Sequence, residues 1–488
     1  MNKYQSLVKK TVYLGWGIGS IVLSGELCAQ GSVFSFKPNV IYILCDDLGY
    51  GEVGYNGQEK IETPELDRLA SQGMIFSNHY CGNAVSAPSR CVLLTGRHPG
   101  HALIRANSPG YPDGQVPLLE GSETIGKLMQ RAGYKTACIG KWGLGAFSNS
   151  GNPNRQGFDY FFGYTDQVHA HDYYPSYLWR NGEKVQLNKQ GICKDYSHDL
   201  FTEEAFRFIR ENQERPFFLY LAYTIPHVRY QVPDLAQYKD RDWPENMKIH
   251  AAMTSRLDKD VGRLVSLLEE LKLDENTLII FSSDNGAHGQ FGSFEFFRTS
   301  GELRDKKRSL YEGGVRSPTF AYWPGTVPSG TVTEHISAFW DVLPTLSELT
   351  GEPVRGETDG ISFLPTLLGQ PDRQRRHDYL YWELYEGRPQ CAVRYKHWKG
   401  VVRDMRKGLD VELYNVEKDG RETQDVAADY PSVADSIRTM MIRSHEPNPY
   451  WDKENKPLFN LEKACRDNGV EIPMKQKNRK QTGTDHEK

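Results

Sequence analysis

Residues 86–97, SAPSRCVLLTGR, place a hydroxyl group and a guanidinium at the beginning of a predicted short helix. Pro88 suits the first helical turn, and Gly96 is suited to end the helix. Ser86 then lies at the helix N-terminus, where unpaired N–H groups and the helix dipole favour an anion. Arg90 follows one turn later and can reach the same anion. The alternative is that Ser86 is a simple N-cap.

Polar side chains follow four separate apolar runs, at 39–45, 135–140, 217–223 and 277–283. Continuous apolar runs are typical of strands buried in a parallel sheet. Ligands of open α/β sheets bind just beyond the carboxyl ends of the strands. We therefore expect one site to collect the residues that follow these runs, although each alone would be an ordinary loop residue: Asp46, Asp47, Lys141, His227, Asp284 and Asn285.

Oxygen donors dominate this predicted site. Asp46 and Asp47 are adjacent carboxylates that repel each other unless a cation or a basic group pairs with them. Asp284 and Asn285 add a third carboxylate and an amide oxygen. Such a set suits calcium or magnesium rather than zinc. The alternative for Asp46 and Asp47 is a solvated turn, and the second oxygen cluster favours the metal site.

The elements around these runs predict an α/β fold. Helical patterns at 122–132, 199–212 and 249–273, and one that begins at Pro64, alternate with the strands. Strands that alternate with helices indicate a parallel sheet covered by helices. We predict a large mixed, mostly parallel sheet that lies between helices.

Composition changes after about residue 369 and predicts further segments. A polar, basic stretch at 371–376 suggests a linker. Strands at 379–383, 390–395 and 398–403 and a helix at 431–443 predict a small antiparallel-sheet subdomain. The predicted organisation is a signal peptide at 1–30, a catalytic domain at 31–370, a C-terminal α+β subdomain at 371–474 and a disordered tail at 475–488.

The net charge and the N-terminal sequence indicate which kinds of partner and which location we expect. The net charge of −4 over 488 residues favours neither a nucleic acid nor an anionic membrane as partner. The first 30 residues have a basic start and an apolar stretch too short for a mature membrane span. We expect a periplasmic protein without stable membrane insertion. Cys28 suggests a lipid anchor, but the residues before it lack the small side chain expected there.

The string at 86–97 resembles the C/S-x-P-S-R…T-G-R signature of type I sulfatases, and the resemblance extends over about residues 39–425. It implies an alkaline-phosphatase-like fold and the conversion of Ser86 to formylglycine, whose hydrate is the nucleophile. The strings DDLGYG at 46–51 and SDNG at 283–286 resemble the metal motifs of that family. They imply one Ca²⁺ bound by Asp46, Asp47, Ser86, Asp284 and Asn285.

The remaining catalytic residues also come from this resemblance. GKWGLG at 140–145 implies that Lys141 contacts sulfate, and TIPH at 224–227 implies that His227 is the general acid. In the family, a lysine lies five residues before the glutamate of an EGG motif, and this spacing selects Lys307 rather than Lys306. The resemblance also implies that Arg90 contacts the sulfate. Gly143 departs from the family, in which a histidine often stands there. His101, His171 or water remain open as its replacement.

Two loops, at 98–107 and 167–174, are predicted to shape a sugar pocket, with ordinary surface loops as an equal alternative. Their strings resemble bacterial sulfatases that act on galactose or N-acetylgalactosamine sulfates. The predicted substrate-binding residues are His101, Arg105, Asn107, His169 and His171.

Two alternatives to a sulfatase acting on sulfated carbohydrate remain at this stage. One is a phosphatase or phosphonate-ester hydrolase with the same fold, which often needs two zinc ions and more His and Asp ligands. The other is a catalytically silent glycan-binding protein whose Ser86 is never oxidised. Serine at position 86 also implies an anaerobic formylglycine-generating maturase as partner, and therefore a bacterium that lives without oxygen.

Overall fold

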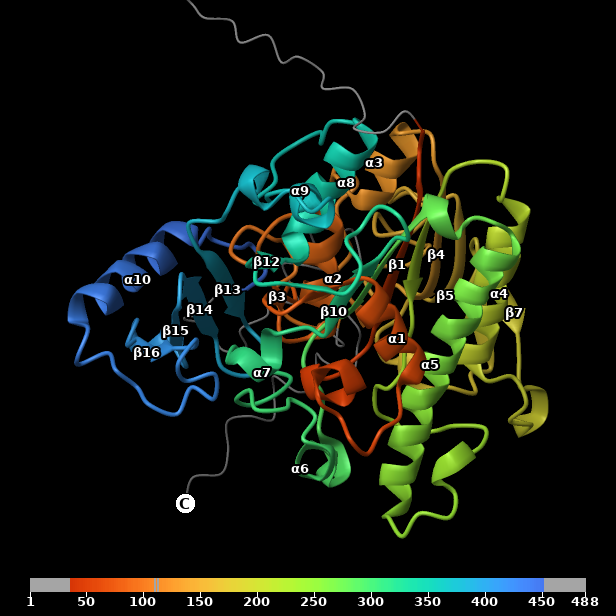
Figure 1. Cartoon of the computed structure of the whole chain (residues 1–488), viewed down its shortest axis with the longest axis horizontal. Coiled ribbons are helices and arrows are strands. Elements are labelled where there is room, and N and C mark those ends of the chain that lie inside the picture. The colour runs from red at the N-terminus through yellow and green to blue at the C-terminus, as the bar shows by residue number, and fades with distance from the viewer. Residues whose placement is uncertain (1–35, 109–110, 112–113, 452–488) are drawn as a thin grey trace, which may run out of the picture.

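The computed structural model describes residues 36–108, 111 and 114–451, and a ten-stranded sheet runs through it (Figure 1). The predicted signal peptide, the predicted tail and residues 452–474 lie outside the described residues. The four predicted strands form the centre of the sheet and are mutually parallel. Their order is β9 (Thr277–Ser283), β1 (Asn39–Cys45), β8 (Phe217–Ala222) and β4 (Lys135–Lys141).

The edges of the sheet were not predicted. One side continues through β5, which is parallel to β4, and then through β6 and β7, each antiparallel to the strand before it. The other side continues through β10, which is antiparallel to β9, and then through the short parallel pair β2 and β11. Most of these strands are short, and several are partly exposed, so they lack a long apolar run. They are β5 (Tyr160–Tyr164), β6 (Tyr177–Arg180), β7 (Glu183–Gln186), β10 (Thr319–Tyr322), β2 (Met74–Phe76) and β11 (Thr331–Thr333).

Alternate side chains of β1 divide the interior into two cores. Tyr42 and Leu44 belong to one apolar cluster, and Ile41 and Ile43 belong to the other, because successive side chains of a strand point to opposite faces. The first core is covered by α2 (Ser86–Thr95), α3 (Ile125–Arg131) and α8 (Val342–Thr350). The second is covered by α1 (Pro64–Gln72), α4 (Ser197–Glu211) and α5 (Glu245–Glu270). The predicted sheet between two helix layers is confirmed.

A second, four-stranded antiparallel sheet follows, as predicted (Figure 1). It consists of β13 (Leu380–Leu384), β14 (Gln390–Tyr395), β15 (Trp398–Val402) and the unpredicted β16 (Glu412–Asn415). The buried side chain of Ile437 in α10 (Pro431–Ser444) packs against Gly400 of β15. Shorter elements are β3 (His79–Tyr80), β12 (Ser337–Ala338), α6 (Ser293–Phe297), α7 (Glu312–Val315) and α9 (Leu364–Leu367).

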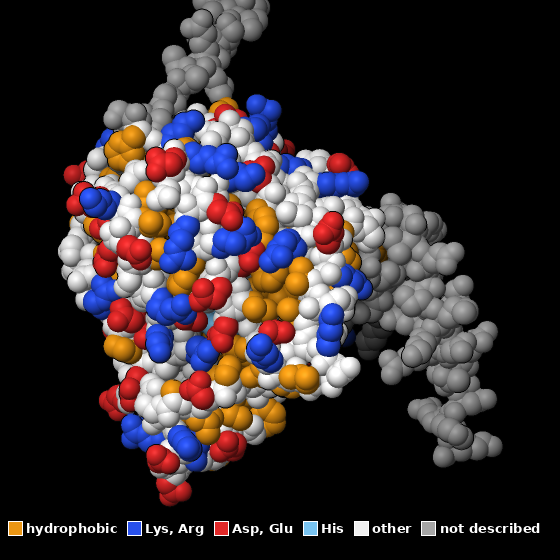
Figure 2. Space-filling model, turned by 90° about the vertical axis from the view of Figure 1, so that its right-hand side faces the viewer, with side chains coloured by type: hydrophobic (Ala, Val, Ile, Leu, Met, Phe, Trp, Pro, Cys, Tyr) orange, Lys and Arg blue, Asp and Glu red, His pale blue; other side chains and the backbone are white. Residues whose placement is uncertain are grey.

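The surface agrees with the small net charge. On the face shown in Figure 2, basic and acidic side chains are interspersed. None of the helices in the described ranges combines the length and the apolar character needed to cross a membrane.

Candidate active site

The four central strands are parallel, so their carboxyl ends lie side by side at the same end of the sheet. This arrangement brings the predicted residues together. Asp46 and Asp47 directly follow β1, and Lys141 is the last residue of β4. His227 lies five residues beyond β8, and Asp284 and Asn285 follow β9. All six side chains are buried. The structure therefore brings together the six residues that the strand pattern predicted to share one site.

Ser86 is the first residue of α2 and lies inside this cluster. Val85, rather than Ser86, is the N-cap, and Gly96 ends the helix in the left-handed region at φ +66°. The Ser86 hydroxyl donates to Asp46 Oδ1 at 2.9 Å and accepts from Lys141 Nζ at 3.3 Å. Only 2 % of Ser86 is exposed. Its hydroxyl is thus held by a carboxylate and an ammonium rather than by its own helix.

Three buried cations pair with the three carboxylates. Lys141 Nζ donates to Asp46 Oδ2 at 2.6 Å, and Lys307 Nζ donates to both oxygens of Asp47 at 2.7 and 2.8 Å. The guanidinium of Arg90 donates through Nε and Nη2 to Asp284 Oδ2 at 3.1 and 2.8 Å. Such charge-assisted hydrogen bonds hold each side chain in one orientation.

These pairs set the ionisation of the carboxyl groups. Burial opposes charge on Asp46 and Asp47, but Lys141 beside the first and His227 and Lys307 beside the second lower both pKa values, that of Asp47 to about 2. Burial and the neighbouring Asp46 raise the pKa of Asp284 to about 6 in spite of Arg90. All three are carboxylates at neutral pH and can accept hydrogen bonds or bind a cation.

His227 links this cluster to the solvent side. Its Nδ1 contacts the backbone carbonyl of Val228, and its Nε2 lies 3.2 Å from Lys307 Nζ and 3.3 Å from Asp47 Oδ2. Burial lowers the pKa of His227 well below its ordinary value; Asp47 opposes this, and Lys307 adds to it. With Nδ1–H donating to Val228, Nε2 is free to exchange a proton with Lys307 and with a group that enters the site.

A cavity of about 700 Å³ opens over Ser86. Lys141, His227 and Lys307 line it, together with the predicted substrate-binding residues Asn107 and His171. The His171 ring stacks on His227 at 4.1 Å between ring centroids. This volume is ample for one or two sugar units in contact with Ser86.

The backbone at Gly143 explains why no side chain is present there. Gly143 has φ +70°, and a Cβ added to it would lie 2.1 Å from Nε2 of Gln167. Gln167 donates from Nε2 to the Gly143 carbonyl at 3.0 Å and lines the cavity beside Lys141. Gln167 therefore takes the space that a side chain at position 143 would need. Gln167 lies in the predicted pocket loop at 167–174 but was not among the predicted substrate-binding residues, and the glycine at position 143 was the further signal that pointed to it.

Both predicted loops contribute to the cavity wall, but three of the five predicted substrate-binding residues, His101, Arg105 and His169, do not line it. Arg105 is 2 % exposed, and its guanidinium contacts Glu383 and the carbonyls of Ala102 and Gly100. His169 packs against Tyr164 and Tyr177.

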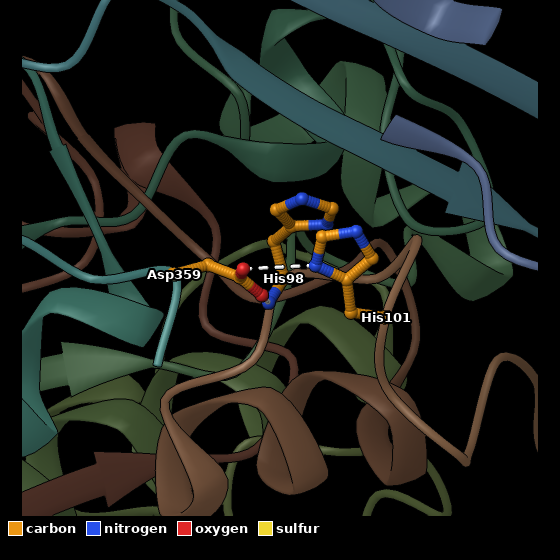
Figure 3. Close-up of side chains that lie close together, drawn as sticks. All are labelled: His98, His101 and Asp359. Carbon is orange, nitrogen blue, oxygen red and sulfur yellow. Dashed lines mark hydrogen bonds and ion pairs between the residues drawn. The ribbon is translucent and has the colours of Figure 1, made fainter. Parts of the chain in front are cut away.

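His101 lies in a separate cluster with His98 and Asp359 (Figure 3). Its Nδ1 is 2.8 Å from Asp359 Oδ1, and its ring stacks on His98 at 4.0 Å. The planes of the two rings make an angle of 29°, and both rings lie beside Asp359 (Figure 3). The cluster connects two loops, and His101 is not placed to replace a histidine at position 143.

The oxygen cluster below the cavity fits a hard cation. Asn285 donates from Nδ2 to Asp47 at 2.7 Å, whereas its buried Oδ1 has no hydrogen-bond partner among the described residues. Ligand atoms of Asp46, Asp47 and His227 lie within 4.8 Å of one another. An unpartnered buried oxygen beside carboxylates is the donor set that Ca²⁺ prefers.

Comparisons with known proteins agree on one family. Residues 38–352 match the model named Sulfatase, and residues 302–446 match that of the N-sulphoglucosamine sulphohydrolase C-terminal region. The chain is 32% identical to N-acetylgalactosamine-6-sulfatase of Canis lupus familiaris over 81% of this chain and 78% of that protein.

Solved structures extend this similarity to the whole architecture. The structure of Ps i-CgsB in complex with k-i-k-neocarrahexaose superposes with a TM-score of 0.75 at 28% identity and covers 91% of this chain and 99% of that chain. A structure from work on glycosaminoglycan metabolism by Bacteroides thetaiotaomicron has a TM-score of 0.72 at 26% identity, with 83% and 98% covered.

Proposed function

This chain belongs to the sulfatase family and is a sulfuric ester hydrolase, and we propose that it removes O-sulfate from galactose or N-acetylgalactosamine in a glycan. The observation that carries the proposal is the Ser86 hydroxyl, which contacts Asp46 and Lys141 at the base of a cavity. Similarity to an N-acetylgalactosamine-6-sulfatase and to a protein crystallised in complex with k-i-k-neocarrahexaose supports these sugars.

Two groups complete the proposed site. Ser86 is converted to formylglycine, and Asp46, Asp47, Asp284 and Asn285, with the modified side chain at position 86, hold one Ca²⁺. When present, the hydrated aldehyde supplies a nucleophile with a second hydroxyl for release of sulfate, and the ion polarises it. The unpartnered Asn285 Oδ1 supports the ion, and the buried contacts of Ser86 support the modification.

The chain's own residues then bind and orient the ester. Lys141 and Lys307 line the cavity, and Arg90 Nη2 lies 3.7 Å from the Asp46 oxygen that accepts from Ser86. All three positive charges are thus near the place where the sulfate oxygens gain negative charge in the transition state. Their pairing with buried carboxylates fixes their positions before substrate binds, so little reorganisation is needed.

Proton transfer to the leaving alcohol is assigned to His227. Lys307 Nζ lies 3.2 Å from its Nε2 and can pass a proton to it. The imidazole, which lines the cavity, then protonates the departing sugar oxygen. His171 stacks on His227 and keeps that ring in place. His171 and Asn107 line the same cavity and are the proposed sugar contacts.

Maturation and localisation follow from the residue types. A serine at position 86 supports an anaerobic maturase as partner, and the N-terminal sequence supports export to the periplasm. Expression in a host without that maturase should give inactive protein. A Ser86→Cys variant should regain activity in a host that oxidises cysteine at this position, and activity of the unmodified serine form would contradict the proposal.

The decisive experiment combines two measurements on protein from its native source. The mass of the Ser86 peptide should be lower by about two units, for the two hydrogens lost in forming the aldehyde. Sulfate should be released from one of the 4- or 6-sulfated forms of galactose and N-acetylgalactosamine. An unmodified serine, with glycan binding but no release, would instead indicate a glycan-binding protein.

A further inference from the structure

A second cavity, of about 960 Å³, lies between the large sheet and the C-terminal sheet. Its walls include β11 and the segment after it, residues 366–380, and the end of β14 with the turn that follows. None of its lining residues lines the Ser86 cavity. We call it the Arg394 cavity after the basic residue buried in its wall.

Three basic side chains, three histidines and three acidic side chains line this cavity. Its acidic residues all have exposed side chains, so they lie where water can solvate them. Arg376 and Lys396 are also exposed, whereas only 3 % of Arg394 is exposed. The basic residues are Arg376, Arg394 and Lys396, the histidines are His335, His377 and His397, and the acidic residues are Glu334, Asp378 and Glu417.

Arg394 is incompletely satisfied. Its Nε donates to the Tyr80 hydroxyl at 3.2 Å, but its buried Nη1 has no hydrogen-bond partner within the described part of the chain. A buried guanidinium donor without an acceptor is destabilising, because it has lost water and gained nothing in return. An acceptor that comes from outside the chain would remove this cost.

The charges next to Arg394 strengthen the argument. Glu312 is the acceptor for both Lys399, at 2.8 Å, and Arg316, whose Nε lies 2.8 Å away. Glu422 is buried in the same cluster, and burial raises its pKa to about 8 against the influence of Lys399, so it is neutral at pH 7. Lys399 and Arg316 therefore share one carboxylate, and Arg394, which is close enough to lower the pKa of Glu312, has no ion pair within the described part of the chain.

We propose that the Arg394 cavity is a second anion site, in which Arg394 binds a sulfate group of the glycan at a distance from the Ser86 cavity. Lys396 and Arg376 at its edge would contact further sulfates of the same chain. Excess buried positive charge attracts any oxyanion, so the shared chemistry is a tetrahedral oxyanion. That the oxyanion belongs to a glycan rests on the proposed function; the anion site itself does not.

Calorimetric titration of the full-length Ser86→Ala protein tests the proposal without turnover. The probes are a sulfated galactan oligosaccharide, the same oligosaccharide after desulfation, and inorganic sulfate. We expect the sulfated oligosaccharide to bind at two sites per chain and the desulfated one to lose the second site. Arg394→Met should remove the second site, with at least a tenfold loss of affinity there.

A second variant covers the case in which Arg394→Met fails to fold. Arg376→Glu combined with Lys396→Glu changes only exposed residues and should weaken the second site about tenfold. Lys189→Glu is the matched control, because Lys189 is an exposed lysine just after β7, at the opposite edge of the large sheet from β11. In protein that keeps Ser86, neither Arg394→Met nor the combination of Arg376→Glu and Lys396→Glu should alter kcat/KM for a monosaccharide sulfate.

Each outcome bears on a different part of the proposal: the anion site, the glycan as its ligand, or the proposed function. Inorganic sulfate that binds in an Arg394-dependent way, without oligosaccharide binding, would support the anion site and overturn the glycan as its source. Equal binding of the sulfated and desulfated oligosaccharides, or a second site insensitive to both variants, would overturn the proposal. Arg394-dependent binding in a protein that releases no sulfate would refute the proposed function and retain this site.

Discussion

The Ser86 cavity and the Arg394 cavity are each bordered by three buried cations, but they differ in the number of carboxylates. At the Ser86 cavity, the lining residues Lys141 and Lys307 and the buried Arg90 beneath Asp46 and Asp284 each have an aspartate partner. Beside the Arg394 cavity, Lys399 and Arg316 share Glu312, and Arg394 has an unpaired Nη1. One cluster is balanced in charge, and the other carries an excess of positive charge.

This difference indicates how each cavity would bind an anion. In a balanced cluster, the field that attracts a sulfate ester must come from an additional charge, and one divalent cation at the aspartates would supply it. The second cluster already has the excess and needs no metal. The same ligand chemistry is thus expected at both places, with metal dependence at only one of them.

Substitution of Ser86 should produce the largest difference between the two cavities, because it should nearly abolish catalysis in one and leave anion binding in the other unchanged. Ser86→Ala should lower sulfate release by about four orders of magnitude, because no covalent route remains. Anion binding in the Arg394 cavity should not change. Ion chromatography of released sulfate, with Ser71→Ala as an exposed serine control, checks this. Release that persists in the Ser86→Ala protein would show that another residue is the nucleophile.

Metal removal should have the next largest effect. Dialysis against a chelator should reduce activity by about three orders of magnitude, because the aspartates would then only neutralise Lys141, Lys307 and Arg90. Added Ca²⁺ should restore it. Arg394-dependent binding of inorganic sulfate should persist throughout. Mass spectrometric metal analysis measures the ion content, and full activity at less than about 0.1 ion per chain would contradict the one-ion site.

The space at Gly143 offers a finer test of the Ser86 cavity. Gly143→Ala should displace the Gln167 amide, and Gln167→Ala should remove it; each should lower kcat/KM about tenfold. The double variant should lose little more, since both changes remove the same group. Gly57→Ala is the matched control, because Gly57 also has a positive φ, +92°, but nothing lies within 4 Å of its added Cβ. If the losses in kcat/KM of the two single variants instead added up in the double variant, Gly143 and Gln167 would act independently of each other.

The smallest expected effect concerns Glu422, next to the Arg394 cavity. Its raised pKa means that the folded protein keeps this proton while the unfolded chain releases it above the ordinary pKa. The stability that the group contributes is complete below that ordinary value and is lost as pH rises to about 8. The side chain of Glu422→Gln cannot ionise. The free energy of unfolding of this variant, relative to that of the wild type, should therefore increase by about 1 kcal/mol per pH unit between pH 5 and 7.5.

Urea unfolding at several pH values measures this difference. Glu417→Gln removes an exposed carboxylate from the wall of the same cavity and should leave the pH dependence unchanged. A Glu422→Gln protein with the pH dependence of the wild type would show that Glu422 is ionised in the folded state. The Arg394 cavity would then have less excess positive charge than proposed.

Much of the catalytic arrangement was predictable from local patterns. β1 and β9 are long apolar runs, so their burial and parallel pairing could be predicted. Asp46 and Asp284 follow these runs directly, and their meeting at one sheet edge is a property of the fold class. The edge strands β6, β7 and β11 were missed because they are short and partly exposed, and only pairing with a neighbour makes them strands.

The sequence by itself determined the central strands, the helix that begins at Ser86 and the family, because each is written in contiguous residues. Tertiary structure alone decided the rest, since it depends on partners far apart in the chain. Arg105 contacts Glu383, 278 residues later, and is therefore buried rather than in the sugar pocket. Gln167 fills the space over Gly143, and Arg394 is unpaired next to a carboxylate that two other cations share. No local pattern encodes such pairings.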